Sequence, residues 1–442
     1  MIASIAASLL AAISFGTGPG IDCKVANALT QPFVPNRVIL RATQPLADDP
    51  AALQKVLSDK LHVPPSALKI TPVGATAFAV DSIGVDIAQP ALFDRLQNDD
   101  HWRYAVRDPY IFDHGDVDTD DTYFHSNVTP MWGLRAIHAP ATWASSTGSA
   151  DVVVAIVDGG ISPDHEDLTP LWKSTVAVGN CPAGFGGYDA IDNRCQIKVR
   201  SAHATEMAGT IGAHAGNHVG VVGVNWTVSL LSSAFMDKGI GCASAAVDAL
   251  HFVTSAIAAG VNVRVVNLSW GTSVDEPTLR SELQVLSSLG VVLVASAGND
   301  GNDISIQANA TYPATYPLDT LIAVAAAQQD LSLISTSNRG ATVHIAAPGL
   351  TIVTTSVSSA LPHRTDTYDI DTTGTSIAAA HVTGTIALLA AKCPKLTGKQ
   401  LKDLMLDNSQ PVQALNGVVA NKRFLDAKAA MDATIEKCKA FE

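Results

Sequence analysis

From about residue 130 onward the sequence alternates short, continuously apolar runs with longer stretches of helical periodicity. Three of the apolar runs read DVVVAIVD, VRVVNLSW and VVLVASAGN. Strands that are apolar on both sides are typical of a parallel sheet whose two faces are covered by helices. The pattern therefore predicts an α/β fold over residues 129–442, with a doubly wound, mostly parallel sheet and helices on both faces.

A different pattern occupies residues 36–111, where two amphipathic helical segments alternate with four strand-like runs. The resulting β-α-β-β-α-β order predicts a small two-layer α+β domain of the ferredoxin-like type. The next segment, residues 112–128, is rich in aspartate and has the composition of a solvated linker that a protease can reach. An ordinary acidic surface loop fits the same composition.

The N-terminal segment MIASIAASLLAAISFGTGPG begins with an apolar run that is shorter than the ~20 residues of a membrane span. We expect residues 1–28 to be a secretory signal peptide, with an uncleaved anchor as the alternative. The protein is then expected outside the cell, in a compartment that permits disulfides. Cleavage after residue 28 would remove Cys23 and leave Cys242 without a partner.

The six cysteines include no C-x-x-C pair, a pattern that argues against a zinc cluster or a redox motif. Cys181 and Cys195 bracket a glycine-rich loop and are the first candidate pair. Cys393 and Cys438 flank the last helical region and are the second candidate pair. The net charge of −13 argues against a nucleic-acid partner. We expect a monomer without a stable membrane span.

Several polar residues lie at the predicted carboxyl ends of strands, where the functional residues of doubly wound sheets are usually found. Asp158 ends one predicted strand, Asn299 follows another, and His203 begins the helical segment HATEMAGT. Ser376 begins a further helix in the segment GTSIAAAH, near backbone N–H groups and the positive end of the helix dipole. Each residue also has a plain structural explanation; Thr375 or Ser376, for example, is a candidate helix cap.

In combination, three of these residues would make a catalytic triad: Asp158, His203 and Ser376. Asp158 would hold the tautomer of His203, and His203 would take the proton of Ser376 and return it to a leaving amine. The side-chain amide of Asn299 would donate to the oxyanion that forms during the attack. The set predicts nucleophilic hydrolysis of an acyl bond.

The segments VVVAIVDGGI, HATEMAGT, AGND and GTSIAAAHVTG jointly resemble the motifs of the subtilase family of serine endopeptidases, and the resemblance runs from about residue 36 to the C-terminus. It implies a secreted enzyme that acts on proteins or peptides. It also implies that the 36–111 domain is an inhibitory propeptide whose tail lies in the cleft until it is cut.

The resemblance further implies the residues that bind substrate. Two short edges would pair with the substrate backbone as a β-strand, and a pocket beside them would receive one substrate side chain. The edge residues implied are Gly239, Ile240, Gly241, Ser269, Trp270 and Gly271, and the pocket residues implied are Ser296, Ala297, Gly298 and Thr311. The bond between Tyr312 and Pro313 is expected to be cis.

No cofactor is implied as a requirement. The family often uses calcium for stability, and Asp167 matches one recurring ligand. One carboxylate does not define a calcium site, because such a site needs six or more oxygens. A structural calcium ion therefore stays an open expectation.

Three positions depart from the family pattern. Ala204 adds a methyl group beside the histidine, and Ala380 replaces a proline. Glu206 replaces a second histidine, and its carboxylate is expected to favour the protonated form of His203 or to repel acidic substrate side chains. These departures keep open an alternative, a catalytically impaired binding or regulatory protein with the same fold.

Two other kinds of site are less well supported. His203, Glu206, His214 and His218 have helix-like spacings, but the HExxH zinc motif is absent. The segment GIGCAS lacks the third glycine of a dinucleotide-binding turn, and no P-loop lysine follows it. Neither a metalloprotein nor a nucleotide-binding protein is expected.

Overall fold

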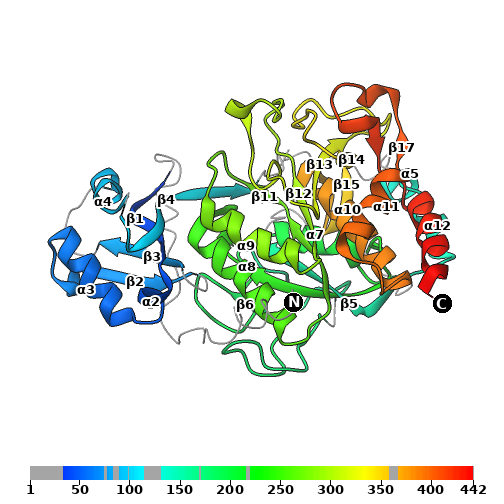
Figure 1. Cartoon of the computed structure of the whole chain (residues 1–442). Helices are drawn as coiled ribbons and strands as arrows, with labels where there is room; N and C mark the ends of the chain where they lie inside the picture. The colour runs from blue at the N-terminus through cyan, green and yellow to red at the C-terminus, as the bar shows by residue number, and fades with distance from the viewer. Residues whose placement is uncertain are drawn as a thin grey trace.

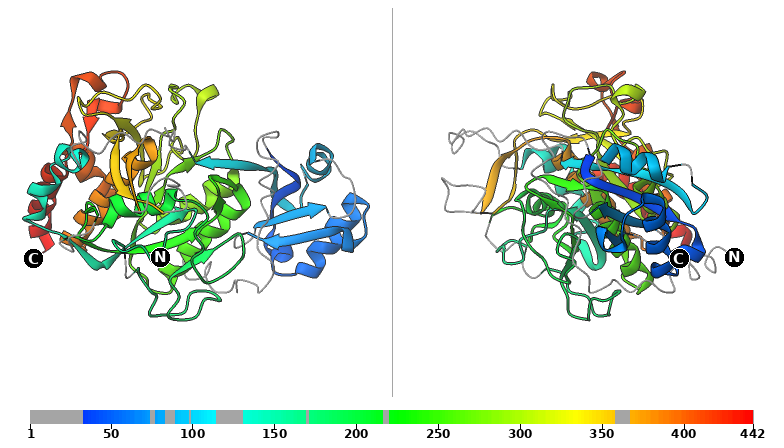
Figure 2. Two further views of the ribbon diagram at one scale, coloured as in Figure 1. Left: turned by 180° about the vertical axis from the view of Figure 1, so that it is seen from behind. Right: turned by 90° about the vertical axis from the view of Figure 1, so that its left-hand side faces the viewer.

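The computed structural model describes residues 33–73, 77–82, 89–97, 99–113, 131–168, 171–215, 220–357 and 367–441. The chain forms two units that lie side by side in both views from front and behind (Figures 1 and 2). The first unit comprises the described residues of 33–113, and the second unit those of 131–441. The predicted signal peptide and most of the predicted linker lie outside the described residues.

The first unit has the predicted β-α-β-β-α-β order. Its main elements are β1 (Phe33–Ala42), α3 (Pro50–Leu61), β2 (Leu68–Pro72), β3 (Ala77–Ser82), α4 (Gln89–Leu96) and β4 (Trp102–Asp113), with short helices α2 (Gln44–Ala47) and η2 (Pro65–Ala67). The strands pair in the antiparallel order β2-β3-β1-β4. This strand order is that of a ferredoxin-like domain.

The first unit has a hydrophobic core of its own. Leu53, Leu57 and Leu61 recur every fourth residue along α3, so they share one face of the helix and are fully buried. Asp49 caps the start of this helix by accepting hydrogen bonds from two backbone N–H groups of its first turn. A hydrophobic core that is separate from that of the rest of the chain indicates an independent structural unit.

A nine-stranded, mostly parallel sheet forms the centre of the second unit and confirms the predicted fold class. Its order is β17-β18-β14-β13-β12-β10-β5-β7-β6, and β17–β18 is its one antiparallel pair among the described residues. The strands are β5 (Gly148–Asp158), β6 (Gly187–Asp189), β7 (Thr227–Ala234), β10 (Val263–Leu268), β12 (Val292–Ser296), β13 (Leu321–Ala327), β14 (Ile345–Pro348), β17 (Gln410–Pro411) and β18 (Arg423–Phe424).

Helices cover this sheet in two packed pairs, α7 with α10 and α8 with α9. The helices are α5 (Trp132–Ala136), α6 (Ala139–Trp143), α7 (His203–Gly212), α8 (Ala243–Ala258), α9 (Pro277–Ser288), α10 (Thr375–Lys392), α11 (Gly398–Asp407) and α12 (Ala427–Cys438). Short 3-10 turns η3 (Gln307–Asn309), η5 (Gln413–Leu415), η6 (Ala420–Lys422) and η7 (Lys439–Phe441) complete the unit. A hairpin of β15 (Ile352–Thr355) and β16 (Tyr368–Thr372) packs against α7.

Small residues let α10 pack closely inside the second unit. A Cβ atom at Gly384 would lie 2.7 Å from Cβ of Val224, a separation that real contacts do not show. Ala378, Ala379 and Ala380 are fully buried on the same helix. The alanine-rich sequence is therefore explained by the short distance between α10 and its neighbours.

Strand β4 belongs to both units. Beyond the first unit it pairs antiparallel with β9 (Ile240–Cys242), which in turn pairs with β8 (Met236–Asp237). On its other side it pairs antiparallel with β11 (Trp270–Gly271). The end of β4 therefore lies between two edges of the second unit, as Figure 1 shows for β11.

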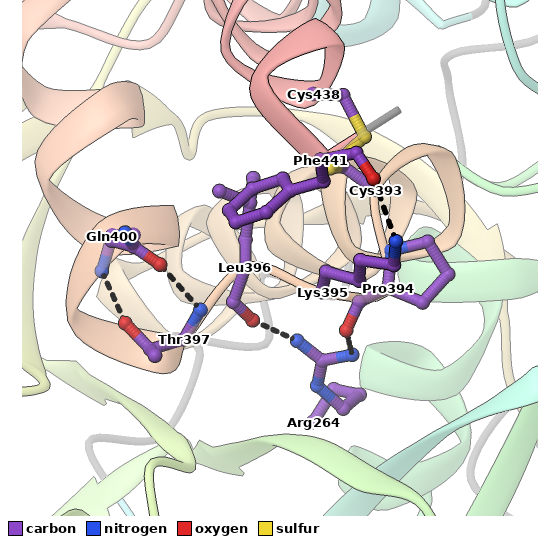
Figure 3. The surroundings of a disulfide bond; sticks show 9 residues. All are labelled: Arg264, Cys393, Pro394, Lys395, Leu396, Thr397, Gln400, Cys438 and Phe441. Carbon is purple, nitrogen blue, oxygen red and sulfur yellow. Dashed lines mark hydrogen bonds between the residues drawn. A yellow bond between two sulfur atoms is a disulfide. The ribbon is translucent and has the colours of Figure 1, made fainter.

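Both predicted disulfides are present. Cys181 is bonded to Cys195, and Cys393 is bonded to Cys438. Figure 3 shows the second bond, which joins the end of α10 to the end of α12. Beside it, Lys395 Nζ donates to the carbonyl oxygen of Phe441 at 2.8 Å, so the C-terminal turn is held to the same region.

None of the helices among the described residues combines the length and the apolar character that crossing a membrane requires.

Candidate active site

Asp158 is the last residue of β5, an interior strand of the sheet that lies between β10 and β7. Its side chain is fully buried, and Oδ1 accepts a hydrogen bond from the backbone N–H of Gly159 at 2.6 Å. This bond leaves Oδ2 directed to a second partner. The carboxylate is therefore fixed at the carboxyl end of a parallel strand, as predicted.

His203 is the first residue of α7 and is the second partner of Asp158. Its Nδ1 lies 2.8 Å from Asp158 Oδ2, and both side chains are buried. An Nδ1–H donated to the carboxylate leaves Nε2 as the basic nitrogen of the ring. The two residues that are 45 positions apart in the sequence thus form an acid–histidine pair.

Ser376 is the second residue of α10 and is buried at the start of that helix. Gly374 precedes the helix with a φ of 142°, a value that favours glycine. The Ser376 hydroxyl donates to the carbonyl oxygen of Ser269 at 3.1 Å, and the Ser269 hydroxyl donates to the Ser376 carbonyl oxygen at 3.1 Å. These two bonds join the start of α10 to the segment that leads into β11.

Asn299 lies beside the same helix start. Its Oδ1 accepts from the backbone N–H of Thr375 at 2.9 Å and from the Thr375 hydroxyl at 3.1 Å. The orientation of the amide is therefore fixed, and among the described residues its buried Nδ2 has no hydrogen-bond acceptor. A buried, oriented and unpaired donor is what an oxyanion requires.

Thr375 is a residue whose role the sequence did not reveal. It was a candidate helix cap, but no side-chain cap bond is present at the start of α10. Its hydroxyl instead accepts from the backbone N–H of Gly298 at 3.1 Å and donates to Asn299. Thr375 therefore positions the amide group, and only its place next to Ser376 signals this in the sequence.

The two predicted substrate-binding edges are the two neighbours of β4. Ile111 pairs with Gly241 and Phe112 with Ile240, while Gly271 also pairs with Phe112. Gly239 lies in the turn before β9. The predicted edges therefore hold an extended chain between them, and that chain is the end of β4.

Trp270 has a structural role in addition to its backbone pairing. Its ring is fully buried, its Nε1 donates to the carbonyl oxygen of Val157 at 2.7 Å, and it packs edge-on against Phe235. Val157 is the neighbour of Asp158. The Trp270 side chain therefore fixes β11 relative to the strand end that carries the carboxylate.

The predicted pocket residues lie in two places, at the end of β12 and in a segment that pairs with the residue after β11. Ser296, Ala297 and Gly298 run from the end of β12 to Asn299, and Ser296 and Ala297 are fully buried. Thr311 is buried and precedes Tyr312, whose backbone exchanges two hydrogen bonds of 2.8 Å with Thr272. The Tyr312–Pro313 bond is cis, as expected.

Glu206 lies one turn after His203 on α7 and is buried. Ser356 Oγ donates to its Oε1 at 3.1 Å, a contact that the sequence did not predict. Burial raises the pKa of the Glu206 carboxyl to about 7, and the charges of Asp369 and Asp158 act in the same direction, while the charge of His203 opposes them. This carboxyl therefore changes its charge near neutral pH beside the acid–histidine pair.

Two observations on the described residues concern metal binding. The Oδ2 of Asp167 accepts from the backbone N–H of Val221 at 2.7 Å and so fixes a loop. Across the described part of the chain, no three His, Cys, Asp or Glu side chains lie together in a way that would hold a metal ion. His218 lies outside the described residues.

Comparison with known proteins gives one family. Residues 149–427 match the Subtilase family. Subtilisin J of Geobacillus stearothermophilus is 32% identical over 274 residues, which cover 62% of this chain and 64% of that protein. Thermitase of Thermoactinomyces vulgaris is 32% identical over 276 residues, which cover 62% of this chain and 85% of that protein.

A solved structure extends the likeness in fold to both units. Fervidolysin from Fervidobacterium pennivorans, described as a keratinolytic enzyme related to subtilisin, aligns with a TM-score of 0.69 over 96% of this chain and 64% of that chain. The sequence identity is 22%, so this likeness concerns the fold alone.

Proposed function

Because this chain belongs to the subtilase family, we propose that it is a serine endopeptidase made as a self-inhibited precursor. The observation that carries the proposal is the hydrogen bond of 2.8 Å between His203 Nδ1 and Asp158 Oδ2. It leaves His203 Nε2 as a base at the same end of the sheet as Ser376. The carboxylate also stabilises the imidazolium that forms when the base takes a proton.

The reaction begins with Ser376 Oγ. Rotation about the Cα–Cβ bond turns the hydroxyl from Ser269 toward His203 Nε2, which takes its proton as Oγ attacks the carbonyl carbon of the substrate. Asn299 Nδ2 and the N–H groups at the start of α10 stabilise the oxyanion. The C–N bond then breaks as the imidazolium gives its proton to the leaving amine.

The acyl-enzyme is hydrolysed by the same groups in reverse roles. Water enters where the amine left, and His203 takes one of its protons as the oxygen attacks the ester carbon. Collapse of the second oxyanion breaks the bond to Ser376 Oγ, which recovers its proton from His203. The products are a carboxylic acid and an amine, and Asp158 stays ionised throughout.

The substrate is proposed to be an extended protein or peptide segment. The antiparallel pairing of β4 with both β9 and β11 supports this proposal, because a substrate strand could pair with the same two edges. Recognition then rests on the substrate backbone, and the region of Ser296–Gly298 and Thr311 is proposed to receive one side chain.

The same pairing supports the proposal that the first unit is an inhibitory propeptide. While the end of β4 occupies the space between the edges, no other segment can pair there. Cleavage in residues 114–130 and departure of the first unit would free both edges. The processing bond is proposed to lie in this acidic segment.

An exported location is supported by two observations. The disulfides Cys181–Cys195 and Cys393–Cys438 are typical of oxidising compartments. A relative that is 30% identical over 293 residues is the minor extracellular protease Epr of Bacillus subtilis. We therefore propose that the protein acts outside the cell.

The test is the intact mass of the purified protein after exposure to a fluorophosphonate, which modifies activated serine hydroxyls. We expect a single adduct on the wild type after loss of the first unit and none on Ser376→Ala. A peptide map should place the adduct on Ser376.

Absence of the adduct from protein that has lost the first unit would overturn the proposal. That outcome would mean that Ala204 and Glu206 prevent catalysis, and it would favour a binding or regulatory protein with this fold. An adduct on a different serine that persists in Ser376→Ala would overturn the assignment of Ser376 as the nucleophile. It would leave the proposed serine-peptidase function standing.

A further inference from the structure

Arg200 is a buried cation in the segment that leads to His203. Only 5% of its side chain is exposed. Its Nε and Nη2 donate to Oδ2 of Asp189 at 3.1 and 2.8 Å, and Nη2 also lies 3.0 Å from Oδ2 of Asp192. Its Nη1 lies 3.7 Å from Oδ2 of Asp237. The guanidinium therefore joins carboxylates that come from two separate parts of the chain.

Two of these carboxylates belong to the loop that the Cys181–Cys195 disulfide closes. Asp189 ends β6, and its Oδ1 accepts from the backbone N–H groups of Ile191 and Asp192 at 3.0 and 3.1 Å. The loop is thus held by a covalent bond at its ends and by hydrogen bonds inside it. It is a fixed anchor for the guanidinium.

The third carboxylate lies at the predicted substrate-binding edge. Asp237 ends β8, and the next two residues, Lys238 and Gly239, have positive φ values of 50° and 78° where the chain turns into β9. The carbonyl oxygen of Arg200 accepts from the backbone N–H of Lys238 at 3.4 Å. Arg200 therefore contacts this turn through both its side chain and its backbone.

The same arginine contacts the strand end that carries Asp158. The backbone N–H of Arg200 donates to the carbonyl oxygen of Gly159 at 2.9 Å. Within the sheet, Ala234 of β7 pairs with Asp158 of β5 on one side and with Asp189 of β6 on the other. The arginine and its carboxylates therefore lie at the same end of the sheet as the acid–histidine pair.

We propose that Arg200 is a positioning residue for substrate binding, which fixes the edge at residues 239–241 relative to Asp158. The inference rests on the proposed peptidase function. The planar guanidinium sets the direction of each ion pair, so the turn before β9 is held in one place. An edge that is already ordered loses little conformational freedom when a substrate strand pairs with it.

The test uses two processed variants that change one contact each. Asp237→Asn keeps the shape of the side chain and removes its charge. Arg200→Lys keeps the positive charge and loses the planar pairing with Asp189. The matched control is Lys198→Gln, because Lys198 Nζ pairs with Asp192 at 2.8 Å rather than with the edge.

Each protein is assayed with a peptide long enough to pair with β9 and with a short ester that ends before β9. We expect KM for the peptide to rise about two- to fivefold in Asp237→Asn and about tenfold in Arg200→Lys, with kcat changed by less than about twofold. Combining the two substitutions should add little to the effect of Arg200→Lys, because both remove the same contact. The ester kinetics and the rate of fluorophosphonate labelling should stay at the wild-type values, and Lys198→Gln should match the wild type in every assay.

An unchanged KM for the peptide in labelled Arg200→Lys would overturn the inference alone. An equal loss of activity on both substrates, with slower labelling, would also overturn it, because Arg200 would then act on the triad or on the fold as a whole. Absence of labelling in the processed wild type would overturn the proposed function and this inference with it.

Discussion

At the scale of single residues, Asn299 has two functions that one substitution can separate. Its Oδ1 fixes Thr375, and its Nδ2 is the proposed oxyanion donor. Asn299→Asp keeps an oxygen for Thr375 and removes the donor. We expect kcat to fall by ~10²–10³ with a much smaller change in KM, since loss of the equivalent donor in subtilisin has this effect.

The control is Thr375→Val, which keeps Asn299 and removes the hydroxyl that orients it. Its kcat should fall less than that of Asn299→Asp. If Asn299→Asp retains kcat within threefold of the wild type in steady-state assays, Asn299 is not the oxyanion donor.

Glu206 gives a prediction about stability and pH. Burial raises the pKa of its carboxyl from 4.5 to about 7, so the folded state binds the proton more tightly than the unfolded state. Its contribution to stability is therefore fully present below about pH 4.5 and is lost as the pH rises through 7. Glu206→Gln removes this dependence and should be more stable than its parent at pH 8, by about 1–3 kcal/mol.

The measurement is chemical denaturation at pH 5 and pH 8 in the Ser376→Ala background, which prevents self-digestion. The stability difference between the Gln variant and its parent should grow with pH. A difference that is the same at both values would mean that Glu206 does not titrate in this window. Ser356→Ala, which removes the hydrogen bond to the carboxylate, should act in the opposite direction at pH 8.

The catalytic candidates were predictable because each lies in a short motif at the end of its own strand or helix. The sequence named four candidates in this way, and their catalytic roles stay predictions: Asp158, His203, Asn299 and Ser376. The residues that position these candidates were not predictable from the sequence, because each positioning residue contacts a partner that is remote in sequence. Thr375 contacts a residue 76 positions away, and Ser356 contacts one 150 positions away.

At the scale of secondary-structure elements, α10 is limited by the space around it. Gly384→Val introduces atoms where Val224 already lies, so we expect a loss of about 1–3 kcal/mol in the free energy of unfolding. The control is Ala391→Val, which also places a β-branched side chain in this helix but at a partly exposed position. It should lower the free energy of unfolding by less than about 1 kcal/mol. Equal losses in the two variants would show that close packing at Gly384 is not the cause.

The long strands and helices were predictable from their periodicity, and the short strands were not. Apolar runs identify β5, β10 and β12, and the spacing of leucines identifies α3. The first unit was expected to end at residue 111, but β4 continues to Asp113. The acidic segment DHGD carries no strand signal, and β4 extends into its first residue because β11 supplies a pairing partner from 157 positions later in the chain.

At the scale of the whole molecule, the proposed maturation requires the protein's own active site. We expect the wild type to lose roughly its first 115–130 residues and Ser376→Ala to retain them, as judged by intact mass under reducing conditions. Addition of a trace of processed wild type to Ser376→Ala separates cleavage within one molecule from cleavage between molecules. Normal processing of Ser376→Ala by itself would mean that another protease removes the first unit.

The arrangement of the two units was only partly predictable. The resemblance to subtilases implied that a propeptide tail lies in the cleft, and the two edges were named by residue. The contact of Arg37 with Cys242 was not expected, because no local pattern in the sequence connects β1 with the residue before α8. The total charge and composition carry no information about this interface.

The shared strand β4 has a consequence for the handling of the released enzyme. After the proposed departure of β4, β9 and β11 would be two open sheet edges with unsatisfied backbone groups, which an extended polypeptide can complete. The most abundant such polypeptide in a concentrated preparation is another copy of the same enzyme, at its frayed ends and loops. The rate at which active enzyme is lost on storage should therefore rise with the square of the enzyme concentration. Dilution, or a ligand bound between β9 and β11, should slow this loss.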